Sequence, residues 1–206
     1  MAATALRRKK ALVLTDGLLA ESFAKTCHGL LRGSERFEVL AVIDREHVGE
    51  DAGQVLDGHP RGLPVFESVE EFFSSGKAGA EVLVVGVAFP GGFLPTTARG
   101  DIAAAIEHGL PVVSGLHHLL GDDPEFKTLA ERHVVELTDI RRPRPASQLH
   151  FWNGAIFDVR APRFPVLGTD CALGKRTTCR WLLEACRAEN LSAEMIYTGQ
   201  TGWMQG

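Results

Sequence analysis

Short runs of apolar residues alternate along most of the chain with segments whose apolar positions recur at helical spacing. Four of the runs predict strands, at residues 11–15, 37–43, 81–87 and 110–114. Their apolar residues are mainly continuous and do not alternate strictly with polar ones. This pattern is typical of strands that are buried on both faces of a sheet.

Helical spacing between these runs predicts helices at residues 18–32, 69–73, 101–107 and 125–132. Residues 49–64 are rich in glycine and charge, which predicts a loop. The rhythm of strand and helix predicts an α/β fold, with a parallel sheet covered on both faces. Because crossovers between parallel strands are right-handed, a Rossmann-like layer is the expected topology.

A group of prolines between residues 143 and 162 marks a change in the character of the chain. We therefore predict a Rossmann-like N-terminal domain over residues 1–145 and a connecting segment over 146–163. Within that segment, residues 150–159 are predicted to form a connecting strand or hairpin.

A second α/β unit is predicted from residue 164 to residue 206, as the start of a P-loop NTPase-like domain. It comprises a strand at 165–167, a loop, a helix from about 175 to 189, and a strand at 193–197. One pair of strands cannot bury a sheet by itself. We therefore expect the chain to be a fragment of a longer protein, with this second domain truncated.

The composition is that of an ordinary soluble globular protein, with 45% hydrophobic and 23% charged residues. A formal net charge of -4 and the lack of a basic stripe give no reason to expect a nucleic-acid partner. No apolar run approaches the length that spans a membrane, so no membrane partner is expected. The four cysteines form no paired CxxC motif, and we expect reduced thiols in a cytoplasmic protein.

Residues 168–178 carry the strongest chemical signal, because a glycine-rich loop lies there between a predicted strand and a predicted helix. Glycines allow successive backbone N–H groups to point at one anion, and the helix N-terminus adds partial positive charge. A glycine-rich turn with a surface lysine is the competing interpretation. The predicted cofactor-binding residues are Gly168, Thr169, Asp170, Cys171, Ala172, Leu173, Gly174, Lys175, Arg176, Thr177 and Thr178.

This loop departs in two ways from the common phosphate-binding pattern. Gly168 and Gly174 enclose five residues, whereas the common pattern has four. Arg176 occupies the position that normally holds a magnesium-binding serine or threonine. Thr177 and Thr178 offer hydroxyls, but a slip of one residue rotates a helical side chain by about 100°. The sequence predicts phosphate binding without ordinary magnesium-dependent nucleotide hydrolysis.

Residues 197–202 follow the last predicted strand. Ligands of open α/β sheets bind at the carboxyl ends of the strands, so Gln200 and Thr201 are predicted to contact the cofactor or the substrate. A simple turn is the competing interpretation.

The loop at 168–175 (GTDCALGK) and the segment at 198–204 (TGQTGWM) resemble the two signatures of the D-glutamate N-acetyltransferase family. Members combine a Rossmann-like N-terminal domain with a P-loop C-terminal domain and were long described as proteins of unknown function. The likeness extends over nearly the whole chain, through segments at 25–32, 86–92, 114–117 and 139–141. The chains of that family continue well past Gly206.

The resemblance implies transfer of an acetyl group from acetyl-CoA to the amine of D-glutamate, in D-amino-acid catabolism. The pyrophosphate of coenzyme A needs to be cradled but needs no magnesium-bound threonine. The arginine at position 176 therefore fits this cofactor, and it could pair with a second phosphate group. A solvated helix residue is the competing interpretation of Arg176.

Acetyl transfer requires a base for the amine and arginine or lysine side chains for the two carboxylates of glutamate. Lys25, Arg32 and Arg141 are the candidate substrate-binding residues, each in a segment that matches the family. His117 follows the fourth predicted strand and is the candidate base, with a hydrogen-bonded loop histidine as the competing interpretation. No third ligand is spaced near His117 and His118, so no metal is predicted.

Two other classes of function remain open from the sequence. The loop at 168–175 also resembles that of dethiobiotin synthetase, which implies an ATP-dependent ligase that uses Mg²⁺. A non-catalytic nucleotide-binding module is the other alternative. In each case we expect a small-molecule ligand and a homo-oligomer. The segment at 86–92 lacks the dinucleotide fingerprint, so a dehydrogenase would rest on fold alone.

Overall fold

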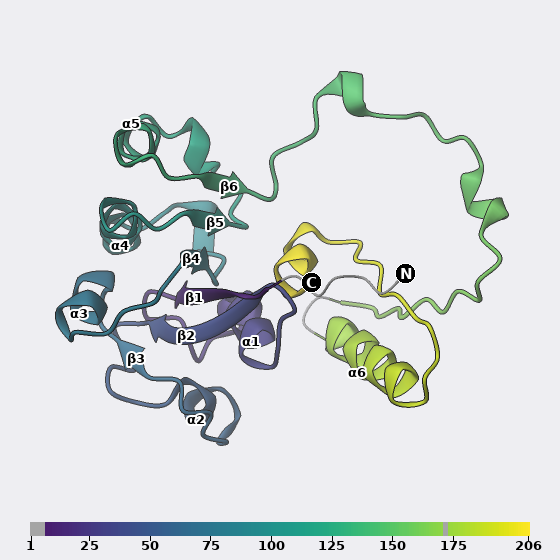
Figure 1. Ribbon diagram of the computed structural model, residues 1–206, viewed down its shortest axis with the longest axis horizontal. Helices are drawn as coiled ribbons and strands as arrows, with labels where there is room; N and C mark the ends of the chain where they lie inside the picture. The colour runs from purple at the N-terminus through teal and green to yellow at the C-terminus, as the bar shows by residue number, and fades with distance from the viewer. Residues whose placement is uncertain (1–6, 171–172) are drawn as a thin grey trace. The chain divides into compact units, whose positions relative to one another are not determined.

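The computed structural model describes residues 7–170 and 173–206, and it contains one parallel β-sheet (Figure 1). The sheet has six strands in the order β3-β2-β1-β4-β5-β6. This is the strand order of doubly wound dinucleotide-binding folds, so the predicted Rossmann-like layer is confirmed. The strands are β1 (Lys9–Leu14), β2 (Phe37–Ile43), β3 (Val65–Phe66), β4 (Val82–Val85), β5 (Val112–Ser114) and β6 (Leu137–Asp139).

Helices connect the strands and cover both faces of the sheet. The α-helices are α1 (Lys25–Leu31), α2 (Ala52–Asp57), α3 (Val69–Ser74), α4 (Thr96–Glu107), α5 (Pro124–His133) and α6 (Lys175–Ala188). The 3₁₀ helices are η1 (Ser22–Ala24), η2 (Pro90–Gly92), η3 (Leu120–Asp122), η4 (Ala146–Gln148), η5 (Ala155–Asp158) and η6 (Gln200–Gln205).

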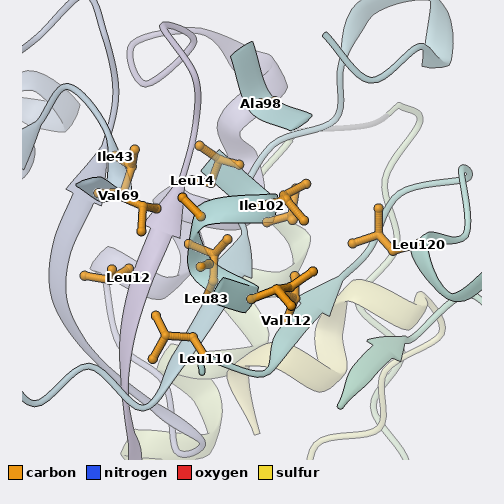
Figure 2. Close-up of a cluster of buried hydrophobic side chains, with 14 of the residues drawn as sticks. Leu12, Leu14, Ile43, Val69, Leu83, Ala98, Ile102, Leu110, Val112 and Leu120 are labelled. Atoms are coloured by element: carbon orange, nitrogen blue, oxygen red, sulfur yellow. The ribbon is translucent and has the colours of Figure 1, made fainter. Parts of the chain in front are cut away.

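The continuous apolar runs of the strands divide between two hydrophobic clusters, one on each face of the sheet. Leu12 and Leu14 of β1 belong to the cluster with α3, α4 and α5, part of which is drawn in Figure 2. Ala11 and Val13 belong to the other cluster, with α1, α2 and Met204 of η6. Successive side chains of a strand point to opposite faces, so a strand between two helical layers needs apolar residues at every position.

The chain forms two compact units. The sheet unit contains the residues up to Arg141 together with Tyr197–Gly206, and the phosphate-loop unit contains Arg142–Ile196. The chain therefore leaves the sheet unit after β6 and returns to it for the last ten residues. The domain boundaries at 145 and 163 stay a prediction.

The expected loop at residues 49–64 is wrong in one respect, because it contains α2. Asp51 starts this helix by accepting hydrogen bonds from the backbone N–H groups of Gly53 and Gln54. Gly58 ends it with a left-handed backbone, φ +76°. With only six residues between a cap and a glycine, α2 is too short to show helical periodicity.

The phosphate-loop unit matches one of its predicted elements and departs from the others. Helix α6 is confirmed at Lys175–Ala188. The strands predicted at 165–167 and 193–197, and the strand or hairpin at 150–159, are wrong: none of the described residues of this unit forms a strand. A strand requires a neighbour for its backbone groups. These apolar residues are exposed here, including Phe164, Leu167 and Ile196.

Candidate functional site

The phosphate loop approaches the N-terminus of α6, with Gly174 as the residue before the helix. Gly174 adopts a left-handed backbone, φ +84°, which glycine accepts without steric cost. Gly174 has no side chain that could cap this end of the helix, and the first turn holds no acidic residue. The first N–H groups of a helix have no partner within it, so they and the partial positive charge of the helix could serve an anion.

Lys175 folds back over the same loop. Its Nζ donates a hydrogen bond to the carbonyl oxygen of Asp170. A Cβ atom on Gly168 would lie 3.1 Å from Cδ of Lys175, so glycine leaves room for this side chain. The ammonium group thus lies over the loop, where a bound phosphate would need a counter-charge. Cys171 and Ala172 lie outside the described residues, and Leu173 is exposed.

The two threonines of the first turn of α6 come after Arg176, so neither occupies the position of the magnesium-binding hydroxyl in the common pattern. Thr178 Oγ1 donates a hydrogen bond to the carbonyl oxygen of Gly174, at 3.2 Å, one turn back along α6. This hydroxyl is therefore engaged with its own helix. Arg176 and Thr177 are half-buried in the first turn, and Thr169 is exposed. The loop offers a lysine, an arginine and helix N–H groups, a donor set that suits a phosphate anion.

A second group of predicted residues meets at the carboxyl ends of β5 and β6. Arg141 Nε donates a hydrogen bond of 2.6 Å to the carbonyl oxygen of Gly115. A Cβ on Gly115 would lie 3.1 Å from Cγ2 of Thr201 and 3.3 Å from Cε of Met204. A side chain here would push both neighbours away by a few tenths of an ångström, so glycine favours the close packing that brings Arg141 and Thr201 to the same turn. The side chain of Gln200 lies outside the description.

Helix η6 is held on the sheet unit by its own buried residues. Met204 is fully buried, and its carbonyl oxygen accepts a hydrogen bond of 2.9 Å from Ser34 Oγ. Gln205 Nε2 donates one of 2.6 Å to the carbonyl oxygen of Gly29. The guanidinium of Arg36 lies 4.2 Å from the ring centroid of Trp203. The second signature segment is thus part of the sheet unit.

Lys25 and Arg32 lie at the two ends of α1, and both are exposed. Lys25 begins this helix, close to the carboxyl ends of the strands. A crossover helix runs antiparallel to the strands that it connects, so Arg32 lies near the edge where β2 begins. The structure therefore separates Arg32 from Arg141, and their shared role in binding the substrate stays a prediction.

The two adjacent histidines after β5 differ in their surroundings. His117 is exposed. His118 Nε2 lies 3.1 Å from Oδ2 of Asp123, the residue that caps α5. Arg99 of α4 binds the same carboxylate with both of its terminal nitrogens, at 2.8 and 3.2 Å. Sequence reasoning missed this network; its only local signal is an Asp-Pro pair five residues after the histidine.

Asp44 at the carboxyl end of β2 is another charged group that sequence reasoning missed. It is fully buried. Its Oδ2 accepts hydrogen bonds from Thr15 Oγ1, at 2.7 Å, and from the backbone N–H groups of Gly17 and Leu19, at 2.9 and 3.0 Å. In dinucleotide-binding folds an acidic residue near this position binds the ribose. Here the carboxylate instead fixes the turn after β1.

Other classes of site receive no support from the residues described. Within residues 7–170 and 173–206, no cluster of three or more histidine, cysteine, aspartate or glutamate side chains could hold a metal ion. In the same residues, no helix is long and apolar enough to cross a membrane. The thiols of Cys27, Cys179 and Cys186 are free, and burial raises the pKa of Cys27 far above its usual range.

The fold is that of an α/β protein with a Rossmann-like domain followed by a P-loop segment. Two family models match the chain in that order. Residues 45–143 match the Rossmann-like N-terminal domain of unknown function DUF1611_N, and residues 150–206 match the P-loop C-terminal domain of the same family. The chain belongs to the DUF1611 family.

Two curated relatives share a name. A D-glutamate N-acetyltransferase from Pseudoalteromonas sp is 36% identical over 126 residues, which cover 61% of this chain and 37% of that protein. A D-glutamate N-acetyltransferase from Tritonibacter scottomollicae is 35% identical over 125 residues, covering 61% of this chain and 36% of that protein. The match thus spans little more than a third of the length of either relative.

A solved structure resembles almost the whole chain. The crystal structure of a DUF1611 family protein from Anabaena variabilis matches with a TM-score of 0.84 at 30% identity. The match covers 96% of this chain and 55% of that one.

Proposed function

We propose that the full-length protein transfers an acetyl group from acetyl-CoA to the amine of D-glutamate. The observation that carries this proposal is the name shared by two relatives that are 36% and 35% identical to this chain. The likeness covers 61% of the chain in each case, and the DUF1611 family models match both its Rossmann-like and P-loop parts.

The geometry of the phosphate loop supports coenzyme A as the ligand of α6. Its pyrophosphate is an anion that the exposed N–H groups of α6 and the ammonium of Lys175 could bind. Binding would exchange the hydrogen bond between Lys175 and the carbonyl of Asp170 for one to phosphate. The hydroxyl of Thr178 bonds to its own helix, which favours a phosphate held without a magnesium-bound threonine.

The turn around Gly115 supports a site for an acidic substrate. Arg141 directs Nε to the carbonyl of Gly115, and the terminal nitrogens of a guanidinium bind a carboxylate in a bidentate way. Thr201 packs against the same turn and would add a hydroxyl. Lys25 stands at the same edge of the sheet and is the second candidate for a carboxylate. Gln200 completes the proposed set, whereas Arg32, at the other end of α1, lies near the opposite edge of the sheet and is not part of it.

Thiol release by the full-length protein tests this function. The protein would be given acetyl-CoA with D-glutamate, with L-glutamate or with no acceptor, and free coenzyme A would be measured over time. We expect release that depends on D-glutamate, together with N-acetyl-D-glutamate detected by mass spectrometry. The absence of coenzyme A release with every acceptor would contradict the proposal.

A parallel sample separates the two other functional classes. Turnover of ATP that requires Mg²⁺, without thiol release, would indicate a ligase of the dethiobiotin synthetase type. Tight nucleotide binding with no turnover of either substrate would indicate a binding module. An acetyltransferase predicts neither result.

A further inference from the structure

His118 contacts a group of charged side chains that α4 and the start of α5 contribute. Asp123 caps α5, and its side chain is 9% exposed. Arg99 of α4 binds both oxygens of this carboxylate and also pairs with Glu125. The guanidinium of Arg99 lies 4.6 Å from the ring centroid of Phe126, which packs it in place. The Asp123 carboxylate that faces His118 is therefore held in place by Arg99 of α4 and by the backbone N–H of Glu125 in α5.

The charged partners of Asp123 keep it ionised. The guanidinium of Arg99 and the ring of His118 lower the pKa of the Asp123 carboxyl to about 2. A carboxylate that faces Nε2 of a neutral imidazole selects the tautomer with its proton on Nε2. The lone pair is then on Nδ1, to which no hydrogen bond is found within the described part of the chain. The ring is 39% exposed, so a ligand can reach it.

The position of His118 links this network to the proposed substrate site. The histidine belongs to the loop that follows β5, and Gly115 begins the same loop. Gly115 contacts Thr201 and accepts the hydrogen bond of Arg141. Asp139 of β6 steadies the far end of the loop, because its carboxylate accepts hydrogen bonds from the backbone N–H groups of Leu120 and Gly121, both at 2.9 Å.

We infer that His118, positioned by Asp123 and Arg99, is the general base for the amine of the acceptor, in place of the neighbouring His117. This inference rests on the proposed acetyl transfer. The acceptor ammonium first loses one proton to solvent. Its nitrogen then attacks the thioester carbonyl carbon, a C–N bond forms, and the C–S bond breaks. Nδ1 takes the second proton from the nitrogen and passes it to the departing thiolate, which leaves as coenzyme A.

Matched glutamine variants of the full-length protein test the assignment. In His118→Gln the side-chain amide can still donate to Asp123, but it cannot accept a proton. We expect kcat to fall by roughly 100-fold or more, the usual contribution of a general base. The melting temperature and the KM for acetyl-CoA should stay close to those of the wild type. His117→Gln is the control and should retain its kcat.

Two further measurements separate a base from a structural histidine. Free imidazole should restore part of the activity of His118→Ala, whereas a residue that only holds the loop would give no rescue. Asp123→Asn should lower kcat in the wild-type background and have little added effect in His118→Gln, because a positioning residue acts through the base.

The wild-type reaction distinguishes the two ways in which this inference can fail. An active wild type with an equally active His118→Gln overturns the assignment and leaves the proposed function standing. The same holds if His117→Gln alone loses kcat. A wild type that transfers no acetyl group overturns the proposed function and the role of His118 together.

Discussion

At the scale of single residues, the buried carboxylate of Asp44 shows how one side chain can hold a turn. It accepts hydrogen bonds from Thr15, Gly17 and Leu19, which fix the segment between β1 and α1. The sequence marks only an aspartate after a strand. Its partners lie 25 to 29 residues away, so no local pattern reveals them.

Removal of this carboxylate should destabilise the protein. Asp44→Ala leaves the backbone N–H groups of Gly17 and Leu19 without their acceptor, and Thr15 Oγ1 keeps only its longer hydrogen bond, to the carbonyl oxygen of Ile43. We expect the free energy of unfolding to fall by roughly 3 kcal/mol, from the loss of hydrogen bonds to a charged group. Urea denaturation measures it, with the exposed Glu46→Ala as the control. Equal stability of the two variants would show that Asp44 does not hold the turn.

The lysine of the phosphate loop should contribute to binding and not to folding. Lys175→Ala removes an ammonium whose hydrogen bond goes to the Asp170 carbonyl oxygen of its own loop. We expect the Kd for coenzyme A to rise about 10- to 100-fold, the contribution of one hydrogen bond between charged groups. Calorimetry on the full-length protein measures this, and the exposed Lys127→Ala on α5 is the control. An unchanged Kd would argue against the phosphate-loop assignment.

Local signals and distant partners explain which parts of the candidate site were predictable. The phosphate loop lies in one stretch of sequence, so its glycines and lysine reveal it directly. The pair of His118 and Asp123 was not recognised, because the neighbouring His117 follows the strand equally well. Only the side-chain contact distinguishes the two histidines.

At the scale of elements, buried strands were easier to predict than short edge strands. The runs that form β1, β2, β4 and β5 are apolar because helices cover both faces. Strand β3 has two residues, and β6 is a Leu-Thr-Asp segment at the opposite edge of the sheet. Both are too short or too polar to show a pattern, and both were missed.

Helix η6 offers a test at this scale, because its buried Met204 side chain packs it onto the sheet unit. Met204 is fully buried and packs in the hydrophobic cluster with α1. Met204→Ala should cost about 2–4 kcal/mol of stability and speed hydrogen exchange in residues 200–205. Met204→Leu preserves the volume and should cost less than about 1.5 kcal/mol. Unchanged exchange in the alanine variant would show that the hydrogen bonds of Gln205 suffice.

At the scale of the whole molecule, the two units differ in how they bury apolar residues. The sheet unit encloses large side chains such as Phe72 and Phe126. In the phosphate-loop unit, Phe151 is 99% exposed and Phe164 is 84% exposed. The sequence predicted strands there because apolar residues usually imply burial. The expectation failed because no strand in the described part of the chain pairs with these segments.

Limited digestion with chymotrypsin should reveal this difference in the 206-residue chain. We expect the first cuts after Phe151, Trp152 and Phe164, where the backbone lies outside regular helices and strands. Cuts after Phe72 and Phe126 should come much later. Mass spectrometry of the early fragments checks the order. Early cleavage within the sheet unit would contradict the division into two units.

The contacts of Gly115 have a consequence for the way the protein could be rebuilt. The chain leaves the sheet unit just after Arg141, which bonds to the Gly115 carbonyl, and returns at Tyr197, shortly before Thr201 packs against the same glycine. The segments where the chain leaves the sheet unit and returns to it therefore lie next to the same residue. Residues 142–196 are thus inserted in the sequence of the sheet unit between two segments that meet at Gly115, and insertions are tolerated when their ends lie close together. A short linker that joins residue 141 to residue 197 should thus leave the Rossmann-like sheet intact. The corresponding segment of a relative could also replace residues 142–196.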